Sequence, residues 1–154
     1  MLVRWLLAAL HLLAYGFALA SILRRTWALR RASVPAALRS VFRADTRWGI
    51  SALVLIVTGL MRAFGGYEKG ADYYLHEPLF HVKMTLLVLI LILEVPSMLG
   101  LMRWRASVRS GQPPNLKKAR SYAHFSVIQT VLLVLMVFAA TGMARGIGLP
   151  EGVV

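Results

Sequence analysis

The sequence predicts an all-α integral membrane protein, in which four transmembrane helices form a single bundle over residues 1–154. Two observations lead to this fold. The chain has four long apolar stretches, and a helix needs roughly 20 apolar residues to cross about 30 Å of hydrocarbon. Most of the 18 Lys and Arg residues lie between the first and second stretches and between the third and fourth. Both basic connections are therefore predicted to be cytoplasmic, which gives an N-out, C-out topology.

The predicted spans follow the apolar stretches in chain order. They cover Leu2 to Leu23, Trp48 to Phe64, Leu79 to Met102 and Tyr122 to Ala144. The remaining connection, 65–78, holds three acidic residues and one lysine, which agrees with a location outside the cytoplasm.

The first basic connection is long enough to carry a helix. Ser33-Val34-Pro35 resembles a helix start, because the missing N–H of proline costs nothing at the first helical position. Beyond it, basic residues repeat every four positions, at Arg39, Arg43 and Arg47. On a helix they would lie on a different side from Leu38. We expect either an amphipathic helix at the membrane interface before the second span, or a basic face exposed to solvent.

The net charge of +12 and the absence of cysteine exclude several classes of protein. The positive charge lies beside the spans, where an anionic leaflet attracts each Lys or Arg by about 1 kcal/mol, so membrane lipids are expected partners. No nucleic-acid recognition motif accompanies the charge, and we expect no nucleic-acid binding. Without cysteine, the chain has no thiol redox chemistry, disulfide or cysteine-ligated metal.

Polar residues within the spans are candidate functional residues, since hydrocarbon offers a polar group no partner. On the first span, Tyr15 follows His11 by one helical turn. On the third span, Lys83, Glu94 and Ser97 share one helical face, and Lys83 and Glu94 lie roughly 16 Å apart along the helix axis. We therefore expect two polar zones, one near the outer surface and one buried toward the cytoplasmic side.

The outer zone is predicted to contain His11, Arg62, His81 and Lys83. Cations beside an apolar slot suit a flat anionic molecule, such as a porphyrin whose propionates pair with Arg or Lys. A neutral imidazole of His11 would then supply the axial ligand of haem iron. The alternative is that His11 forms a hydrogen bond between helices, while Arg62 and Lys83 extend to lipid headgroups.

The buried zone centres on Glu94, because an acid at the centre of a span costs about 2.5 to 3.5 kcal/mol on insertion scales. We expect a protonated carboxyl group that is hydrogen-bonded to Gln129 or Ser97. Pro96 lies two residues further along and is expected to kink the helix. Together, the kink and the neutral acid could serve proton transfer. The alternative is that both have only a structural role.

Several short motifs occur in an order and spacing that resemble a bacterial family. They are Arg43-Ala44-Asp45, Gly59-Leu60-Met61-Arg62, Glu68-Lys69-Gly70, Tyr73-Tyr74-Leu75-His76, Phe80 to Lys83, and Met143-Ala144-Arg145-Gly146. Over nearly the whole chain, they resemble the membrane-protein family called domain of unknown function 2214. The resemblance implies a four-span fold in a bacterial inner (plasma) membrane, and no established activity.

Two shorter segments are similar to the four-helix haem-binding protoporphyrinogen oxidase family of bacteria. In that family the first span carries a histidine, and the third begins with a lysine before a leucine-rich run. The matching residues here are His11 and Lys83. The resemblance implies haem b with His11 as its ligand. Because the chain lacks a further histidine deep in a span, His81 could be a second ligand only if the third span sits deeper.

Two classes of function therefore remain. In the first, the protein is a haem b or porphyrin oxidoreductase, or a module that passes electrons to a quinone. His11 is then the ligand or base, and Arg62 and Lys83 hold the propionates or the substrate. Tyr15 donates a nearby hydrogen bond, and Lys83 and Glu94 are the predicted catalytic groups. In the second class, the chain is a non-catalytic scaffold, in a homo-oligomer or a larger membrane complex, whose polar residues hold helices together.

Overall fold

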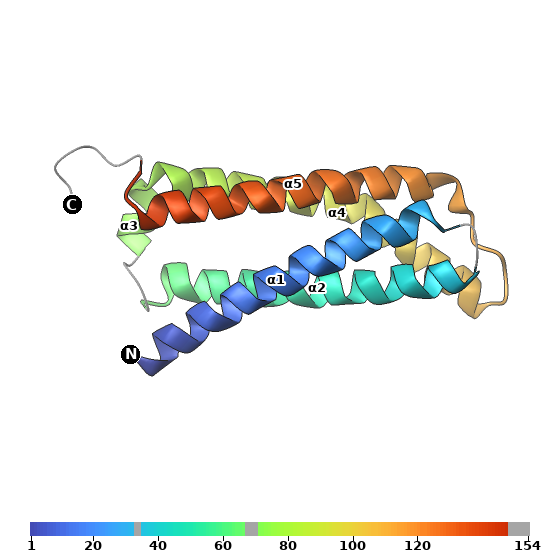
Figure 1. The fold of residues 1–154 in the computed structure, drawn as a ribbon, viewed down its shortest axis with the longest axis horizontal. Coiled ribbons are helices and arrows are strands. Elements are labelled where there is room, and N and C mark those ends of the chain that lie inside the picture. Colours follow the sequence, from blue (N-terminus) through green and yellow to red (C-terminus); the bar gives the residue numbers. More distant parts are fainter. Residues whose placement is uncertain (33–34, 67–70, 148–154) are drawn as a thin grey trace.

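The computed structural model describes residues 1–32, 35–66 and 71–147, which form an all-α fold (Figure 1). The long helices are α1 (Leu2–Arg30), α2 (Pro35–Phe64), α4 (Pro78–Arg109) and α5 (Ala119–Ala144). A short helix, α3 (Ala71–His76), precedes α4, and a 3-10 turn, η1 (Leu116–Lys118), precedes α5. Each long helix is apolar and long enough to cross a membrane, which confirms the predicted four-helix membrane fold.

The four long helices lie in one elongated bundle (Figure 1). α1 packs against α2 and α5, and α5 packs against α4. The N-terminus, α3 and the C-terminal end of α5 lie at one end of the bundle, whereas both basic connections lie at the other. We call these the outer end and the basic end. Their separation agrees with the predicted topology, and the orientation across the membrane stays a prediction.

Three of the helices extend beyond the apolar stretches that predict them. α1 continues to Arg30, α2 begins at Pro35, and α4 continues to Arg109. Hydropathy marks the part of a helix that lies in hydrocarbon, whereas the backbone hydrogen bonds of the helix continue into the polar layer. Helix length therefore exceeds span length at the basic end.

The segment expected to be a separate amphipathic helix is the first half of α2. Arg39, Arg43 and Arg47 lie on this continuous helix, and no break separates them from the second span. The predicted start at Pro35 agrees with the structure, while Ser33 and Val34 lie outside the described residues. The basic residues therefore lie on a continuous extension of a transmembrane helix.

Buried side chains form three clusters along the bundle. The cluster at the basic end includes Leu101, Trp104 and Tyr122, with the ring centroids of Trp104 and Tyr122 5.5 Å apart. The middle cluster contains Ala18, Ile22, Trp48, Ile90 and Leu133, and the outer cluster contains Ala63, Phe80 and Met143. Many other large apolar side chains are exposed, as expected for helices whose outer faces contact lipid.

Gly100 of α4 is a position of close helix contact, because the ring of Tyr122 from α5 packs directly on its backbone. A Cβ atom at Gly100 would overlap that ring, whereas a Cβ atom at Gly49 of α2 would meet nothing within 4 Å. Small residues at helix crossings allow backbones to approach closely. This contact therefore sets the distance between α4 and α5 near the basic end.

Gly100→Ala is expected to destabilise the bundle by about 1 to 3 kcal/mol, because the added methyl group overfills a packed contact. Gly49→Ala is the matched control and should be neutral or stabilising, since alanine has the higher helix propensity. Thermal unfolding of both variants in the same detergent measures the difference. Equal stability would contradict the close packing of Tyr122 on α4.

The orientation can be tested by labelling, because the chain has no cysteine. Ser110 at the basic end and Ile147 at the outer end are both exposed. In cells with a permeabilised outer membrane, an impermeant maleimide should label Ile147→Cys and spare Ser110→Cys. Both variants should react after the inner membrane is disrupted. Labelling of Ser110→Cys alone, before the inner membrane is disrupted, would contradict the predicted topology.

Candidate functional site

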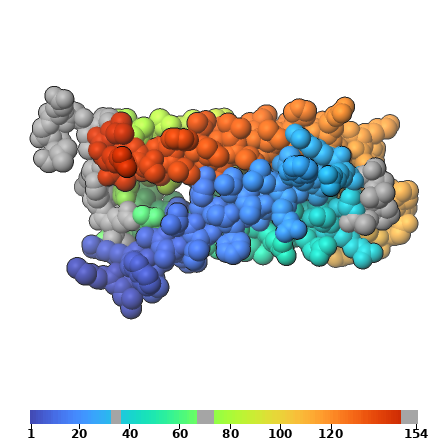
Figure 2. Space-filling model, viewed as in Figure 1, coloured from blue at the N-terminus to red at the C-terminus, as the bar shows by residue number. Residues whose placement is uncertain are grey.

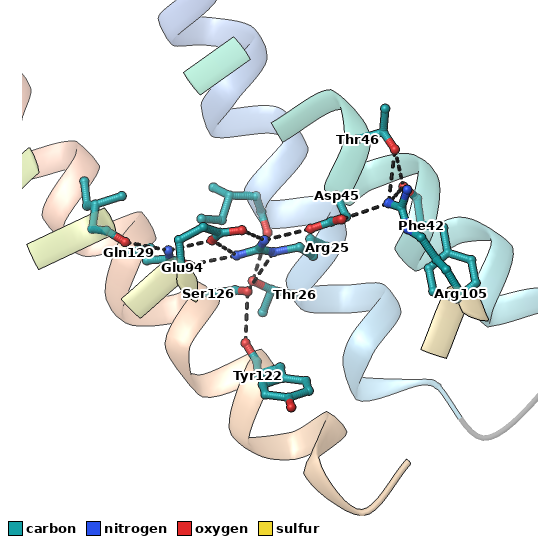
Figure 3. Close-up of polar contacts among 12 residues, drawn as sticks. Arg25, Thr26, Phe42, Asp45, Thr46, Glu94, Arg105, Tyr122, Ser126 and Gln129 are labelled. Carbon is teal, nitrogen blue, oxygen red and sulfur yellow. Dashed lines mark hydrogen bonds and ion pairs between the residues drawn. The ribbon is translucent and has the colours of Figure 1, made fainter. Parts of the chain in front are cut away.

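Arg25 of α1 is fully buried, and its guanidinium group lies among the other three long helices (Figure 3). α2 contributes Asp45 and α4 contributes Glu94 as carboxylate partners. α5 contributes Ser126 and Gln129. One side chain therefore makes polar contacts with residues from every other long helix.

The five N–H groups of Arg25 have five hydrogen bonds. Nη1 donates to Glu94 Oε1 at 2.7 Å and to Asp45 Oδ1 at 3.0 Å. Nη2 donates to Glu94 Oε2 and to Gln129 Oε1, each at 2.8 Å. Nε donates to Ser126 Oγ at 3.1 Å. The parallel pair of bonds to Glu94 is the bidentate geometry in which a guanidinium group best fits a carboxylate.

Gln129 and Asp45 extend this network in different directions. The amide nitrogen of Gln129 donates to Glu94 Oε2 at 2.8 Å and to the carbonyl oxygen of Ile90 at 3.1 Å. Asp45 Oδ2 accepts a hydrogen bond from Nη2 of Arg105 at 2.8 Å, and Arg105 is partly exposed. The network therefore runs from the interior of the bundle to the surface at the basic end. We call Arg25, Asp45, Glu94, Arg105, Ser126 and Gln129 the Arg25 network.

The composition of the Arg25 network explains how charges are accommodated inside the bundle. Burying an ion costs several kcal/mol, and attraction to a counter-ion offsets this cost only when the other hydrogen bonds are also made. The network has two arginines and two carboxylates, and Arg25 uses all of its donors. We infer that it ties the four helices together.

The structure confirms Gln129 as a partner of Glu94 and adds Arg25, a charged partner that the sequence did not predict. The hydrogen bond from Gln129 is present, whereas Ser97 Oγ is buried without a hydrogen-bond partner among the described residues. In place of the expected neutral carboxyl group, Glu94 forms an ion pair with Arg25. Both carboxylate oxygens accept hydrogen bonds, and proton transfer by Glu94 stays a prediction.

Arg25, Asp45 and Arg105 are members of the buried zone that the sequence prediction does not include. Hydropathy assigns all three to the basic connections, although α1, α2 and α4 continue through them. The sequence feature that could have indicated Arg25 was Glu94 itself, because an acid inside a span needs a counter-charge. Arg25 lies only two residues beyond the predicted end of the first span.

A cavity of about 580 Å³ lies between the four long helices. Its lining is mainly apolar and includes Leu55, Leu87 and Met136. α1 diverges from α5 toward the outer end, and Figure 2 shows a hollow between them. The lining also includes Trp48 and Glu94, so the cavity connects the two polar zones that the sequence predicts as separate. Its volume falls within the range of about 300 to 1,000 Å³ that is common for ligand sites.

His11 lines this cavity, and its ring is held by Thr58 of α2. Nδ1 of His11 lies 2.7 Å from Oγ1 of Thr58, and the Thr58 hydroxyl donates to the carbonyl oxygen of Val54 at 2.6 Å. Because that hydroxyl has one proton, Nδ1 of a neutral His11 is the donor of this pair. The tautomer with its proton on Nδ1 carries a lone pair on Nε2.

Tyr15, Arg62 and Lys83 lie in the same lining as His11. The Tyr15 hydroxyl donates to the carbonyl oxygen of Leu133 at 2.5 Å, which connects α1 with α5. Among the described residues, the lining does not include His81, which is exposed, with Nε2 2.9 Å from the carbonyl oxygen of Leu75. The structure therefore brings all the predicted site residues except His81 to one cavity.

Within the part of the chain that the structure describes, no group of three or more His, Asp or Glu side chains is placed to hold a metal ion. A porphyrin supplies most of the ligands of its own iron, and the protein can add one axial histidine. The His11 side of the cavity meets that smaller requirement.

These features define an integral membrane four-helix protein with a buried ionic network and an apolar cavity bordered by polar residues. The chain belongs to the DUF2214 family of predicted membrane proteins, which it matches over residues 3–148. No curated protein and no solved structure matches the chain. Family membership agrees with the membrane fold and assigns no activity.

Arg25→Met is expected to destabilise the bundle by about 3 to 5 kcal/mol, because Glu94 then lacks its buried counter-charge and Asp45 keeps only its pair with Arg105. Arg24→Met is the matched control, since Arg24 is exposed, and its effect should stay within about 0.5 kcal/mol. Adding Glu94→Gln to Arg25→Met should cost less than the sum of the two single effects. Thermal unfolding in detergent measures all four variants, and strict additivity would contradict a direct ion pair.

Proposed function

We propose that the protein binds a flat, largely apolar molecule with anionic groups in the cavity between its four long helices, and that haem b or a related porphyrin is the ligand. One observation carries the proposal: His11, Arg62 and Lys83 share one apolar lining. An apolar cavity with a few convergent polar groups is the usual form of a small-molecule site.

The hydrogen bond of His11 supports a role as an axial ligand. A histidine that binds a metal commonly donates its other ring N–H to a neighbouring acceptor, which fixes the tautomer and the ring orientation. Thr58 Oγ1 is such an acceptor for Nδ1. Nε2 is therefore the nitrogen expected to bind iron, and haem would supply one-electron redox chemistry when bound.

Arg62 and Lys83 are the proposed partners of the anionic groups. Arg62 lies in the last turn of α2, and Lys83 lies in the second turn of α4, so both are near the outer end. Carboxylates paired with them would stay close to the polar boundary, while an apolar ring occupies the interior of the cavity. Tyr15 is expected to shape the wall, because its hydroxyl already donates to Leu133.

Porphyrinogen oxidation and electron transfer to a quinone are the two redox roles compatible with this ligand class. Lys83 is the better candidate for direct contact with a substrate, because it lies near the outer end of the cavity lining. Glu94 borders the cavity from the other side, and its oxygens accept hydrogen bonds from Arg25 and Gln129. We propose that Glu94 mainly holds the inner wall of the site.

A non-catalytic scaffold in a homo-oligomer or larger complex is the second candidate. The observation that favours it is the Arg25 network, in which one side chain joins all four long helices. In this case the cavity would hold lipid chains, and the polar residues of the spans would serve helix association. Ligand binding distinguishes the two candidates.

Haem binding tests the proposed function. Protein purified from haem-replete cells should show a Soret band, and haem-free protein should regain the band on titration with haemin. His11→Ala should abolish the spectrum of ligated haem, because it removes the proposed axial ligand. His124→Ala is the matched control, since His124 is exposed near the basic end of α5 and should leave the spectrum unchanged.

A second titration separates iron ligation from occupancy of the cavity. Iron-free protoporphyrin, followed by its fluorescence, should still bind to His11→Ala. It should bind about tenfold more weakly to the Arg62→Gln, Lys83→Gln double variant, which lacks the charged partners. A ligated spectrum in His11→Ala would remove the ligand role. Failure of wild-type protein to bind either porphyrin would remove the proposed function and favour the scaffold.

A further inference from the structure

A second cavity, of about 510 Å³, lies near the basic end of the bundle between α1 and α2, and it opens widely to the surface. Leu23, Arg24, Trp27 and Arg31 line it from the α1 side, and Ser40 lines it from α2. Its lining residues differ from those of the cavity that contains His11. A ligand of this second cavity is therefore independent of the proposed haem or porphyrin function.

Three of these residues form a continuous face of α1 and its C-terminal cap. Arg24, Trp27 and Arg31 are spaced by three and four residues, which places them one above another on a helix. The guanidinium carbon of Arg31 lies 5.4 Å from the centroid of the Trp27 ring. This cation–π contact holds Arg31 beside the cavity. Two positive charges and an aromatic ring therefore border the same hollow.

The polarity of the lining changes along α1. Ala20 and Leu23 lie toward the middle of the bundle, whereas Arg31 lies at the end of the helix. The helix rises by about 16 Å between Ala20 and Arg31, which carries the lining from the hydrocarbon into the headgroup layer. An exposed tryptophan such as Trp27 is typical of that boundary. The lining thus has the polarity sequence of a phospholipid.

We propose that this cavity binds an anionic phospholipid. The phosphate lies between Arg24 and Arg31, beside Trp27, and the glycerol region and first acyl carbons lie against Leu23 and Ala20. Basic pockets beside transmembrane helices bind anionic headgroups because the charges are complementary. A zwitterionic lipid has the same phosphate and chains but no net charge, so it gains less from the two arginines.

Native mass spectrometry of the purified full-length chain in mild detergent tests the site. Phosphatidylglycerol and phosphatidylcholine with identical chains are added in turn, and the affinity of the first bound lipid is measured. Wild-type protein should prefer phosphatidylglycerol by about tenfold, and Arg24→Gln, Arg31→Gln should lose most of that preference. Arg103→Gln, Arg109→Gln is the matched control, because it removes two exposed charges from the same end of the bundle.

Each result supports or overturns the proposal. Loss of the preference in the Arg24, Arg31 variant, with retention in the control, supports a defined lipid site. Equal loss in both double variants would show that only the net charge of this end matters, and would overturn it. Absence of any preference in wild-type protein would also overturn the site. Displacement of phosphatidylglycerol by glycerol 3-phosphate at equal concentration would show a phosphate site without a role for the acyl chains, and would overturn the lipid assignment.

Discussion

The rest of the structure depends on the five hydrogen bonds of one buried guanidinium group. Arg25 joins α1 to α2 through Asp45, to α4 through Glu94, and to α5 through Ser126 and Gln129. Inside a membrane the hydrophobic effect gives little attraction between helices, so association depends on packing and polar contacts. A fully paired arginine is suited to this task because its donors point in several directions at once within one plane. The bundle is therefore held most specifically near its basic end.

The cavity that contains His11 is a consequence of this unequal distribution of contacts. Near the basic end, the Arg25 network and the Gly100–Tyr122 contact draw the helices together. Toward the outer end, α1 diverges from α5, and the space between the helices is lined by His11, Arg62 and Lys83. Glu94 belongs both to the network and to the cavity lining, and Trp48 lines the cavity while its ring lies 5.8 Å from the Arg25 guanidinium carbon. The Arg25 network, which holds the helices together, therefore also contributes to the inner wall of this cavity through Glu94.

The sequence predicted the four spans because the length of an apolar stretch is a direct measure of the hydrocarbon that it must cross. It also predicted that His11, Arg62 and Lys83 lie together, since helix rise converts residue number into depth. It predicted the hydrogen bond from Gln129 to Glu94 but not the ion pair of Glu94 with Arg25. Arg25 lies among other arginines, and a positive charge near a span end looks the same in sequence whether it faces headgroups or a carboxylate. The distinction depends on helix rotation and tilt, which are set by packing between helices.

The Arg25 network also constrains the order in which the protein can be completed in the membrane. Arg25 and Asp45 belong to the first two long helices to be synthesised, so their pair at 3.0 Å can form before α4 exists. Glu94, Ser126 and Gln129 arrive only with the second half of the chain, and until then four of the five hydrogen bonds of Arg25 lack their final acceptors. In the first helical pair, Asp45 neutralises only part of the charge environment that Arg25 has in the finished bundle. The second pair completes it by supplying Glu94, Ser126 and Gln129. The two halves of the chain therefore depend on each other, because each supplies groups that the other needs to complete the hydrogen bonds of Arg25.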